Sequence, residues 1–260
     1  HTVLNGVDFQ VPEGELTVIL GPNACGKSTT LKALARVNPL KQGEVRLDGT
    51  PLPQMKSRAI AKILAMLPQT PEAPSGVTVA DVVARGRYPH QSLLRSWSDE
   101  DERACVEAMQ AANVLELAER PIEALSGGQR QRVWIAMTLA QQTPLILLDE
   151  PTTYLDITHQ IEVLNLTKKL HSEGRTVAVV LHDLNLAFRY ATHVVLMKQG
   201  RIIAQGDPRA IITPELIQEV FDLQSVIIPD PCTGTPLVIP KENQTIHIAA
   251  DAISAARESE

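Results

Sequence analysis

The residues from position 21 to 29 combine a flexible backbone, a cation and hydroxyl groups, which is a composition suited to binding phosphate. The run GPNACGKS fits the pattern G-x-x-x-x-G-K-[ST], and we call it the phosphate loop (residues 21–28). Glycines let successive backbone N–H groups turn toward phosphate oxygens, and a following helix adds its positive N-terminal end. We expect Lys27 to reach the β- and γ-phosphates of a nucleotide and Ser28 to ligate Mg²⁺. The candidate nucleotide-binding residues are Gly21, Pro22, Asn23, Ala24, Cys25, Gly26, Lys27, Ser28 and Thr29.

A pair of carboxylates follows a continuous apolar run at 145–148, which is typical of a strand buried on both faces. Ligands of open α/β sheets bind at the carboxyl ends of strands, so this pair and the phosphate loop can share one edge. We expect Asp149 to contribute to the Mg²⁺ site. Glu150 is then placed to polarise the water that attacks the γ-phosphate.

A second glycine motif, Ser126-Gly127-Gly128-Gln129, precedes a helix with an apolar face, and we call it the signature segment. Ser126 is a suitable N-cap, and the small residues leave backbone N–H groups open to an anion. Taken alone, the motif is equally typical of an ordinary helix cap after a loop.

The elements that must position these groups alternate between strand-length apolar runs and helical spacing. This alternation predicts an α/β core with a parallel sheet. The segment 70–90 is broken by prolines and glycines, residues 2–9 resemble part of a strand-rich unit, and the tail after Gly206 mixes a short helix with two strands. The expected strands are 16–20, 43–47, 145–148, 176–181 and 194–197, and the expected helices are 27–36, 98–118, 126–141, 157–170 and 183–190.

Composition narrows the choice of partners and compartment. The 260 residues carry a net charge of −6 with a pI near 5.7, which weighs against nucleic acid as a partner. No segment has the 18 or so apolar residues that span a bilayer. Three widely spaced cysteines suggest no disulfide framework and fit a reducing compartment. Cys25 lies beside Lys27 and a helix N-terminus, which favour thiolate, so we expect it to be reactive and protected by MgATP.

In this order and spacing, the motifs resemble those of the ATP-hydrolysing subunits of ABC transporters. The resemblance rests on GPNACGKST at 21–29, Gln69 in LPQ, LSGGQ at 125–129, ILLDEP at 146–151, Asp156 after Leu155, and His182. It implies an α/β fold with a P-loop NTPase (RecA-like) core and parallel sheet, an inserted helical subdomain and a small antiparallel β element. We accordingly expect the ATP-binding core at 1–69 and 133–206, the helical subdomain at 70–132 and a C-terminal extension at 207–260.

The same resemblance implies roles for further residues. Gln69 would sense Mg²⁺ and the attacking water and touch the permease, and His182 would contact the γ-phosphate. Asp156 would lie at the seam of a head-to-tail homodimer, in which the signature segment of one copy closes over the ATP of the other. The implied catalytic residues are Glu150, His182 and Gln69, the implied Mg²⁺ ligands are Ser28, Gln69 and Asp149, and the implied contacts to the partner's ATP are Ser126, Gly127, Gly128 and Gln129.

The sequence departs from the family pattern at two positions. Ala24 stands where the family usually has glycine, and we expect it to avoid an unfavourable φ. Tyr154 is an aromatic where many members carry a small residue. The family's adenine-stacking aromatic is expected upstream of His1, so no residue is assigned that role.

Finer details resemble the importers of ferric siderophores, haem and cobalamin, and among them those of the ferric enterobactin type. These details are ARGRYPH at 84–90, QRQRVWIA at 129–136, LHDLN at 181–185 and GTPLV at 234–238. The resemblance implies an energy-coupling ATPase at the cytoplasmic face of the membrane, bound to permease subunits and linked through them to a substrate-binding protein. Arg85, Arg87 and Tyr88 are either a permease-docking patch or a solvated basic turn.

Two alternatives remain at this point. A soluble ABC ATPase acting on DNA or ribosomes usually carries long coiled coils or two cassettes in a chain, and neither pattern occurs here. A P-loop kinase acting on a small molecule does not need the LSGGQ element. The sequence does not identify the siderophore or the permease.

Overall fold

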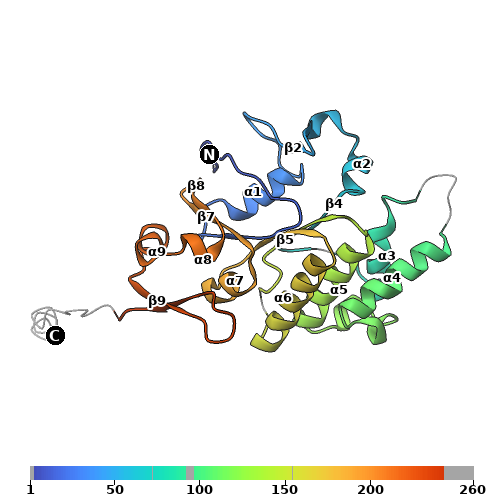
Figure 1. The fold of residues 1–260 in the computed structure, drawn as a ribbon. Helices are drawn as coiled ribbons and strands as arrows, with labels where there is room; N and C mark the ends of the chain where they lie inside the picture. The colour runs from blue at the N-terminus through green and yellow to red at the C-terminus, as the bar shows by residue number, and fades with distance from the viewer. Residues whose placement is uncertain (1–2, 72, 92–96, 154, 243–260) are drawn as a thin grey trace, which may run out of the picture.

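The fold centres on a six-stranded sheet (Figure 1). The computed structural model describes residues 3–71, 73–91, 97–153 and 155–242. In spatial order the strands are β4 (Leu64–Leu67), β5 (Leu145–Asp149), β6 (Thr176–Val180), β1 (Leu16–Leu20), β7 (His193–Lys198) and β8 (Arg201–Gly206). The first five run parallel, and β8 pairs antiparallel with β7 at one edge.

Helices cover both faces of this sheet, so its central strands are almost wholly apolar. Alternate residues of β1 face opposite ways: Val18 belongs to the larger apolar cluster with residues of the helices at 127–140, 157–172 and 184–190, whereas Ile19 packs with Leu31. The helices are α1 (Lys27–Leu34), α2 (Ser57–Ala61), α3 (Val79–Ala84), α4 (Asp99–Ala111), α5 (Gly127–Ala140), α6 (Ile157–Ser172), α7 (Leu184–Tyr190), α8 (Pro208–Ile211) and α9 (Pro214–Phe221).

Two small antiparallel pairs complete the described structure. One is β2 (Arg46–Leu47) with β3 (Thr50–Pro51), and the other is β9 (Ser225–Pro229) with β10 (Pro236–Pro240), which we call the C-terminal hairpin. The predicted α/β fold class, with its parallel core sheet and small antiparallel elements, is confirmed.

Several boundaries differ from the sequence-based expectation. Residues 3–15 form no strand, and the expected helix 98–118 ends at Ala111, shortly before Asn113 adopts a left-handed φ of 55°. The segment 70–90 contains α3, which begins with a capping box between Thr78 and Asp81. β4 and β8 were not expected, and α5 runs across the expected domain boundary at 132/133.

Arg87 lies in a short 3₁₀ turn after α3 and is fully buried, so for this residue both expected alternatives, a surface docking patch and a solvated turn, are wrong. Its Nε donates to Asp101 Oδ1 at 2.9 Å and its Nη1 to the carbonyl of Ala140 at 2.8 Å. The second carboxylate oxygen of Asp101 accepts from the hydroxyl of Ser98, the N-cap of α4. Arg87 thus ties α3 to α4 and to the end of α5, while neighbouring Tyr88 is 63% exposed.

Candidate active site

The residues predicted to bind phosphate or to act in catalysis lie at one edge of the sheet. β4, β5, β6 and β1 are neighbours and parallel, so their carboxyl ends lie together. Each of these strands ends in a predicted site residue or is followed by one within two residues. In spatial order these are Gln69, the pair Asp149 and Glu150, His182, and the phosphate loop.

The phosphate loop is a tight turn whose own carbonyl groups bind its lysine. Lys27 is buried, and its Nζ donates to the carbonyl oxygens of Gly21 at 2.8 Å and Pro22 at 3.0 Å. The loop backbone therefore folds over the ammonium group of Lys27 and shields it from solvent. A Cβ at position 21 would collide with the carbonyl oxygen of Met197, so only glycine fits there.

Two further loop residues differ from expectation. Ala24 adopts a φ of 60°, so it does not avoid the left-handed region as predicted. Cys25 is buried, and burial raises the pKa of its thiol despite the nearby positive charge of Lys27. The expected reactive thiolate is contradicted, because desolvation outweighs the cation.

Asp149 is fully buried, and neither carboxylate oxygen has a hydrogen-bond partner among the described residues. Burial raises its pKa, opposed by the nearby Ser28 hydroxyl and the positive charges of Lys32 and Lys27. An unpaired buried carboxylate beside a hydroxyl fits Mg²⁺, which prefers oxygen ligands and takes one or two carboxylates together with phosphates. Within the described residues, no cluster of three His, Cys, Asp or Glu side chains could hold a metal alone.

Glu150 contacts both of the other predicted catalytic residues, His182 and Gln69. Its Oε1 lies 2.8 Å from Nε2 of His182, and its Oε2 accepts from Nε2 of Gln69 at 2.7 Å. The Thr153 hydroxyl also donates to Oε2, at 3.2 Å. The sequence analysis did not predict that Thr153 contacts Glu150. Its position three residues after Glu150 is the one feature of the sequence that could have indicated this contact.

Electrostatics keep Glu150 ionised at neutral pH. Burial alone would raise its pKa, but the hydrogen bond and charge of His182, then the hydrogen bonds of Gln69 and Thr153, bring the pKa below its usual value. The residue also adopts a left-handed φ of 53°, a strained conformation of the kind that occurs at functional sites. The result is a carboxylate with fixed orientation, able to accept a proton.

The signature segment lies at the start of α5, where Ser126 and Gly127 are exposed and Gly128 and Gln129 are half-buried. Ser126 Oγ accepts from the backbone N–H of Gln129, and Gln129 Oε1 accepts from that of Ser126, forming a capping box. A Cβ built on Gly127 would meet nothing within 4 Å. Among the described residues, no hydrogen bond or ion pair joins this segment to the phosphate loop.

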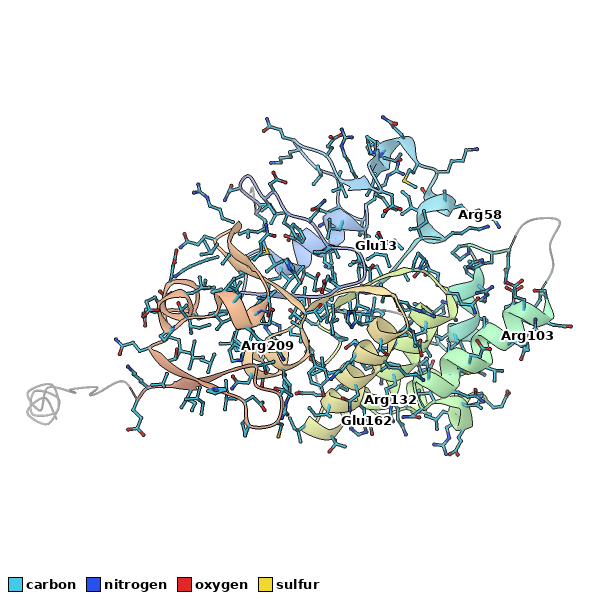
Figure 2. All side chains as sticks on the ribbon, viewed as in Figure 1. Glu13, Arg58, Arg103, Arg132, Glu162 and Arg209 are labelled. Carbon is cyan, nitrogen blue, oxygen red and sulfur yellow. The ribbon has the colours of Figure 1, made fainter. Side chains whose placement is uncertain are left out.

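Asp156 begins the neighbouring helix α6 by accepting from the backbone N–H of His159. α5 and α6 run side by side in the same direction, with Gly128 close to His159 and Arg132 bonded to Glu162 at 3.0 Å (Figure 2). Their N-termini, and with them the signature segment and Asp156, therefore lie at the same end of the helix pair. The aromatic at position 154 lies outside the described residues.

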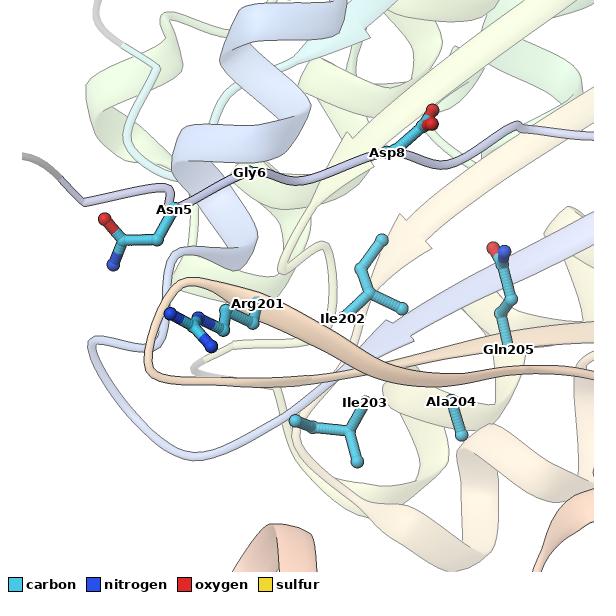
Figure 3. A pocket seen from close by; sticks show the side chains of 8 residues that line it. All are labelled: Asn5, Gly6, Asp8, Arg201, Ile202, Ile203, Ala204 and Gln205. Carbon is cyan, nitrogen blue, oxygen red and sulfur yellow. The ribbon is translucent and has the colours of Figure 1, made fainter.

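A hollow lies between the N-terminal segment and β8 (Figure 3). It is lined by Asn5, Gly6 and Asp8 on one side and by residues 201–205 on the other, and none of the predicted catalytic residues borders it. The residues that line a second hollow include Asp183 and two residues that contact Glu150, His182 and Thr153. None of the helices in the described parts of the chain has the length and apolarity required to cross a membrane.

Known proteins resemble this chain along most of its length. The profile of the ABC transporter family matches residues 4–153. The chain therefore belongs to the ABC transporter family, and it is an ATPase subunit of that family.

Among its relatives, the chain is 49% identical over 241 residues to the ferric enterobactin transport ATP-binding protein FepC of Escherichia coli (strain K12), covering 92% of this chain and 89% of that protein. It is 51% identical over 242 residues to the achromobactin transport ATP-binding protein CbrD of Dickeya dadantii (strain 3937), covering 92% and 90%. A solved inward-facing metal-chelate type ABC transporter matches with a TM-score of 0.76 and 29% identity, covering 91% of each chain. A dimeric bacterial ABC transporter cassette matches with a TM-score of 0.70 and 30% identity, covering 78% of this chain and 89% of that one.

Proposed function

We propose that this chain powers the import of ferric siderophores by hydrolysing ATP as one of two copies bound to a membrane permease at its cytoplasmic face. The observation that carries the hydrolysis step is the convergence of Gln69, His182 and Thr153 on Glu150, beside the phosphate loop. The siderophore assignment is supported by relatives named for ferric enterobactin, achromobactin and iron(3+)-hydroxamate. Hemin importers are also among the relatives, at 43–45% identity.

The chain's own residues account for the chemistry. Backbone N–H groups of the phosphate loop and the start of α1 bind the phosphates, and Lys27 exchanges its two carbonyl partners for phosphate oxygens. Glu150 accepts the proton of the attacking water, and its neighbours hold the carboxylate in place. Ser28 and Asp149 would hold Mg²⁺, which neutralises phosphate charge when bound, and Gln69 would complete that site.

The exposed signature segment supports a second copy of the chain as partner. Its open helix N-terminus is suited to an anion, yet the described structure places no bond between it and the phosphate loop of the same chain. In a head-to-tail pair, Ser126, Gly127, Gly128 and Gln129 would contact the ATP held by the partner, with Asp156 at the seam. A dimeric cassette among the structural relatives is consistent with this arrangement.

The remaining partners belong to the membrane. Gln69, which is exposed and donates a hydrogen bond to Glu150, is placed to connect a permease to the hydrolysis site. The exposed Tyr88 and half-buried Arg85 remain candidates for permease docking. The substrate-binding protein would act through the permease without touching this chain, and the acidic net charge of −6 makes nucleic acid an unsuitable partner.

The decisive experiment is Glu150→Gln. The amide keeps the shape and removes the base, so turnover falls by roughly 10²–10⁴-fold while ATP binding survives. With MgATP, the variant elutes as a dimer in size-exclusion chromatography with light scattering, and without nucleotide it elutes as a monomer.

The matched control adds Ser126→Arg to Glu150→Gln. The long side chain obstructs the partner's phosphate, so the double variant stays monomeric with MgATP. A dimer that persists in the double variant contradicts the sandwich arrangement. Wild-type turnover in Glu150→Gln contradicts the assignment of the base.

The substrate is tested by uptake of iron-59 complexes in cells that lack their own siderophore ATPase and express the cognate permease and binding protein. The wild-type chain restores uptake of a ferric siderophore, and Glu150→Gln does not. Restored uptake of haem or cobalamin alone would reject the siderophore assignment.

A further inference from the structure

The helix that follows His182 is bonded to the C-terminal hairpin through one side chain. Asn185, in the first turn of α7, accepts from the backbone N–H of Val238 at 2.7 Å and donates from Nδ2 to the Val238 carbonyl at 3.2 Å. One amide thus satisfies both backbone groups of a β10 residue, as a neighbouring strand would. The two residues are 53 positions apart, so these bonds fix a tertiary contact.

The hairpin is a firm support for this contact. Val238 is 3% exposed and belongs to the main apolar core. In the turn between the strands, Asp230 accepts from the backbone N–H groups of Cys232 and Thr233 at 2.7 and 3.1 Å. Asp230 also lies 3.4 Å from Arg189, at the other end of α7. α7 is therefore held against the hairpin near both ends.

His182 has little else to place it. Its side chain is 45% exposed, and within the described residues the polar contact of its ring is to Glu150, at 2.8 Å. Its backbone lies between the end of β6 and the N-cap of α7, Asp183, which accepts from the N–H of Leu186 at 2.9 Å. The position of the first turn of α7 therefore sets where the imidazole can reach.

We propose that Asn185 is a positioning residue for hydrolysis: by fixing the first turn of α7 on β10, it holds His182 against Glu150. The C-terminal hairpin then acts as part of the hydrolysis machinery, although it lies outside the edge where the phosphates bind. This inference rests on the proposed function, since it takes His182 and Glu150 as members of the hydrolysis site.

The test is Asn185→Ala, which removes both bonds to Val238. A shift of the imidazole by a fraction of an ångström lowers kcat by roughly tenfold, while KM for ATP changes by less than about twofold because the phosphate loop is untouched. The control is Tyr190→Phe, which removes a 2.8 Å hydrogen bond from α7 to Asn165 without touching the hairpin and keeps wild-type kcat.

A double-mutant cycle with His182→Ala separates positioning from a general structural role. If Asn185 acts through His182, the double variant has the kcat of His182→Ala alone. Losses that multiply in the double variant, or wild-type kcat in Asn185→Ala, overturn the inference.

If Asn185→Ala does not fold, as judged by its unfolding midpoint, the cycle is run with Asn185→Asp, which keeps the acceptor for the Val238 N–H and replaces the donor to the Val238 carbonyl by a charged oxygen that repels it. Failure of the proposed function gives a different result, namely wild-type turnover in Glu150→Gln.

Discussion

The phosphate loop and the signature segment are both glycine-rich turns that precede a helix, yet they differ in how tightly the rest of the chain packs around them. The phosphate loop is largely closed on itself: Lys27 is bound by loop carbonyls, and Gly21 has no room for a side chain. The signature segment is closed only by its capping box, and Gly127 has free space around it. Packing within this chain therefore requires glycine at position 21 of the phosphate loop. At position 127 of the signature segment, a requirement for glycine would have to come from a molecule outside the chain.

The largest expected effect comes from removing the cation that closes the phosphate loop. Lys27→Ala should lower ATP turnover by at least about 10²-fold and abolish most ATP binding, because no other ammonium group in the loop can reach the phosphates. It should also cost about 1–3 kcal/mol of stability, since the carbonyls of Gly21 and Pro22 lose their donor. Steady-state kinetics, nucleotide titration and urea unfolding test this, with the exposed Lys41→Ala as control. Unchanged turnover would show that this loop does not bind the nucleotide.

A second test compares thiols inside and outside the closed loop. Cys25 is buried with a raised pKa, whereas Cys232 is exposed, so maleimide should label Cys232 at least about tenfold faster. Digestion and mass spectrometry with and without MgATP measure both rates in one sample. Cys105, also buried, has a pKa raised to about 11 and provides an internal reference for an inert thiol. Fast labelling of Cys25 would show that the loop opens in solution.

A third test removes the buried carboxylate beside the loop. A carboxyl whose folded pKa is raised destabilises the fold at every pH above its unfolded pKa of about 3.9. Asp149→Asn should therefore raise the free energy of unfolding at pH 7 by about 1 kcal/mol, a gain that shrinks as pH falls toward about 4. Hydrolysis should fall at the same time, because the proposed Mg²⁺ ligand is lost.

The control for this test is Asp156→Asn. The backbone N–H of His159 lowers the pKa of Asp156, so its charge stabilises the fold, and its removal should give no gain. Urea unfolding at pH 7 and pH 5 compares the two variants. A loss of stability in Asp149→Asn would mean that the carboxylate is paired in solution.

The smallest expected effect is at Ala24. Its φ of 60° costs an alanine about 1–2 kcal/mol relative to glycine, of which glycine's greater freedom in the unfolded chain cancels about 0.5–1. Ala24→Gly should stabilise the protein by about 0.5 kcal/mol with turnover unchanged. Ala33→Gly, inside α1, should instead destabilise it by about 1 kcal/mol. Thermal unfolding of both variants measures the difference, and a destabilised Ala24→Gly would show that φ at this position is not left-handed.

Motifs in the sequence predicted most of the residues of the candidate site but few of the contacts between them. The phosphate loop and the Asp149–Glu150 pair could be predicted because their spacing along the chain carries their chemistry. The burial of Lys27 and the role of Thr153 could not, because both depend on how the backbone folds over a side chain. Arg87 looked like a surface arginine because its partners Asp101, Ala140 and Gln142 lie 14 to 55 residues away.

The two carboxylate oxygens of Asp101 have different hydrogen-bond partners. One accepts from Arg87, and the other accepts from the hydroxyl of Ser98, the N-cap of α4. Breaking a buried ion pair by removing one partner typically costs about 3–5 kcal/mol, a large share of a stability of about 5–15 kcal/mol. Replacing Arg87 or Asp101 alone would therefore leave a much less stable intermediate protein, so we expect that neither position changes alone during evolution. The two positions should be inherited as a linked unit, changing together or staying fixed while the solvent-facing residues around them diverge.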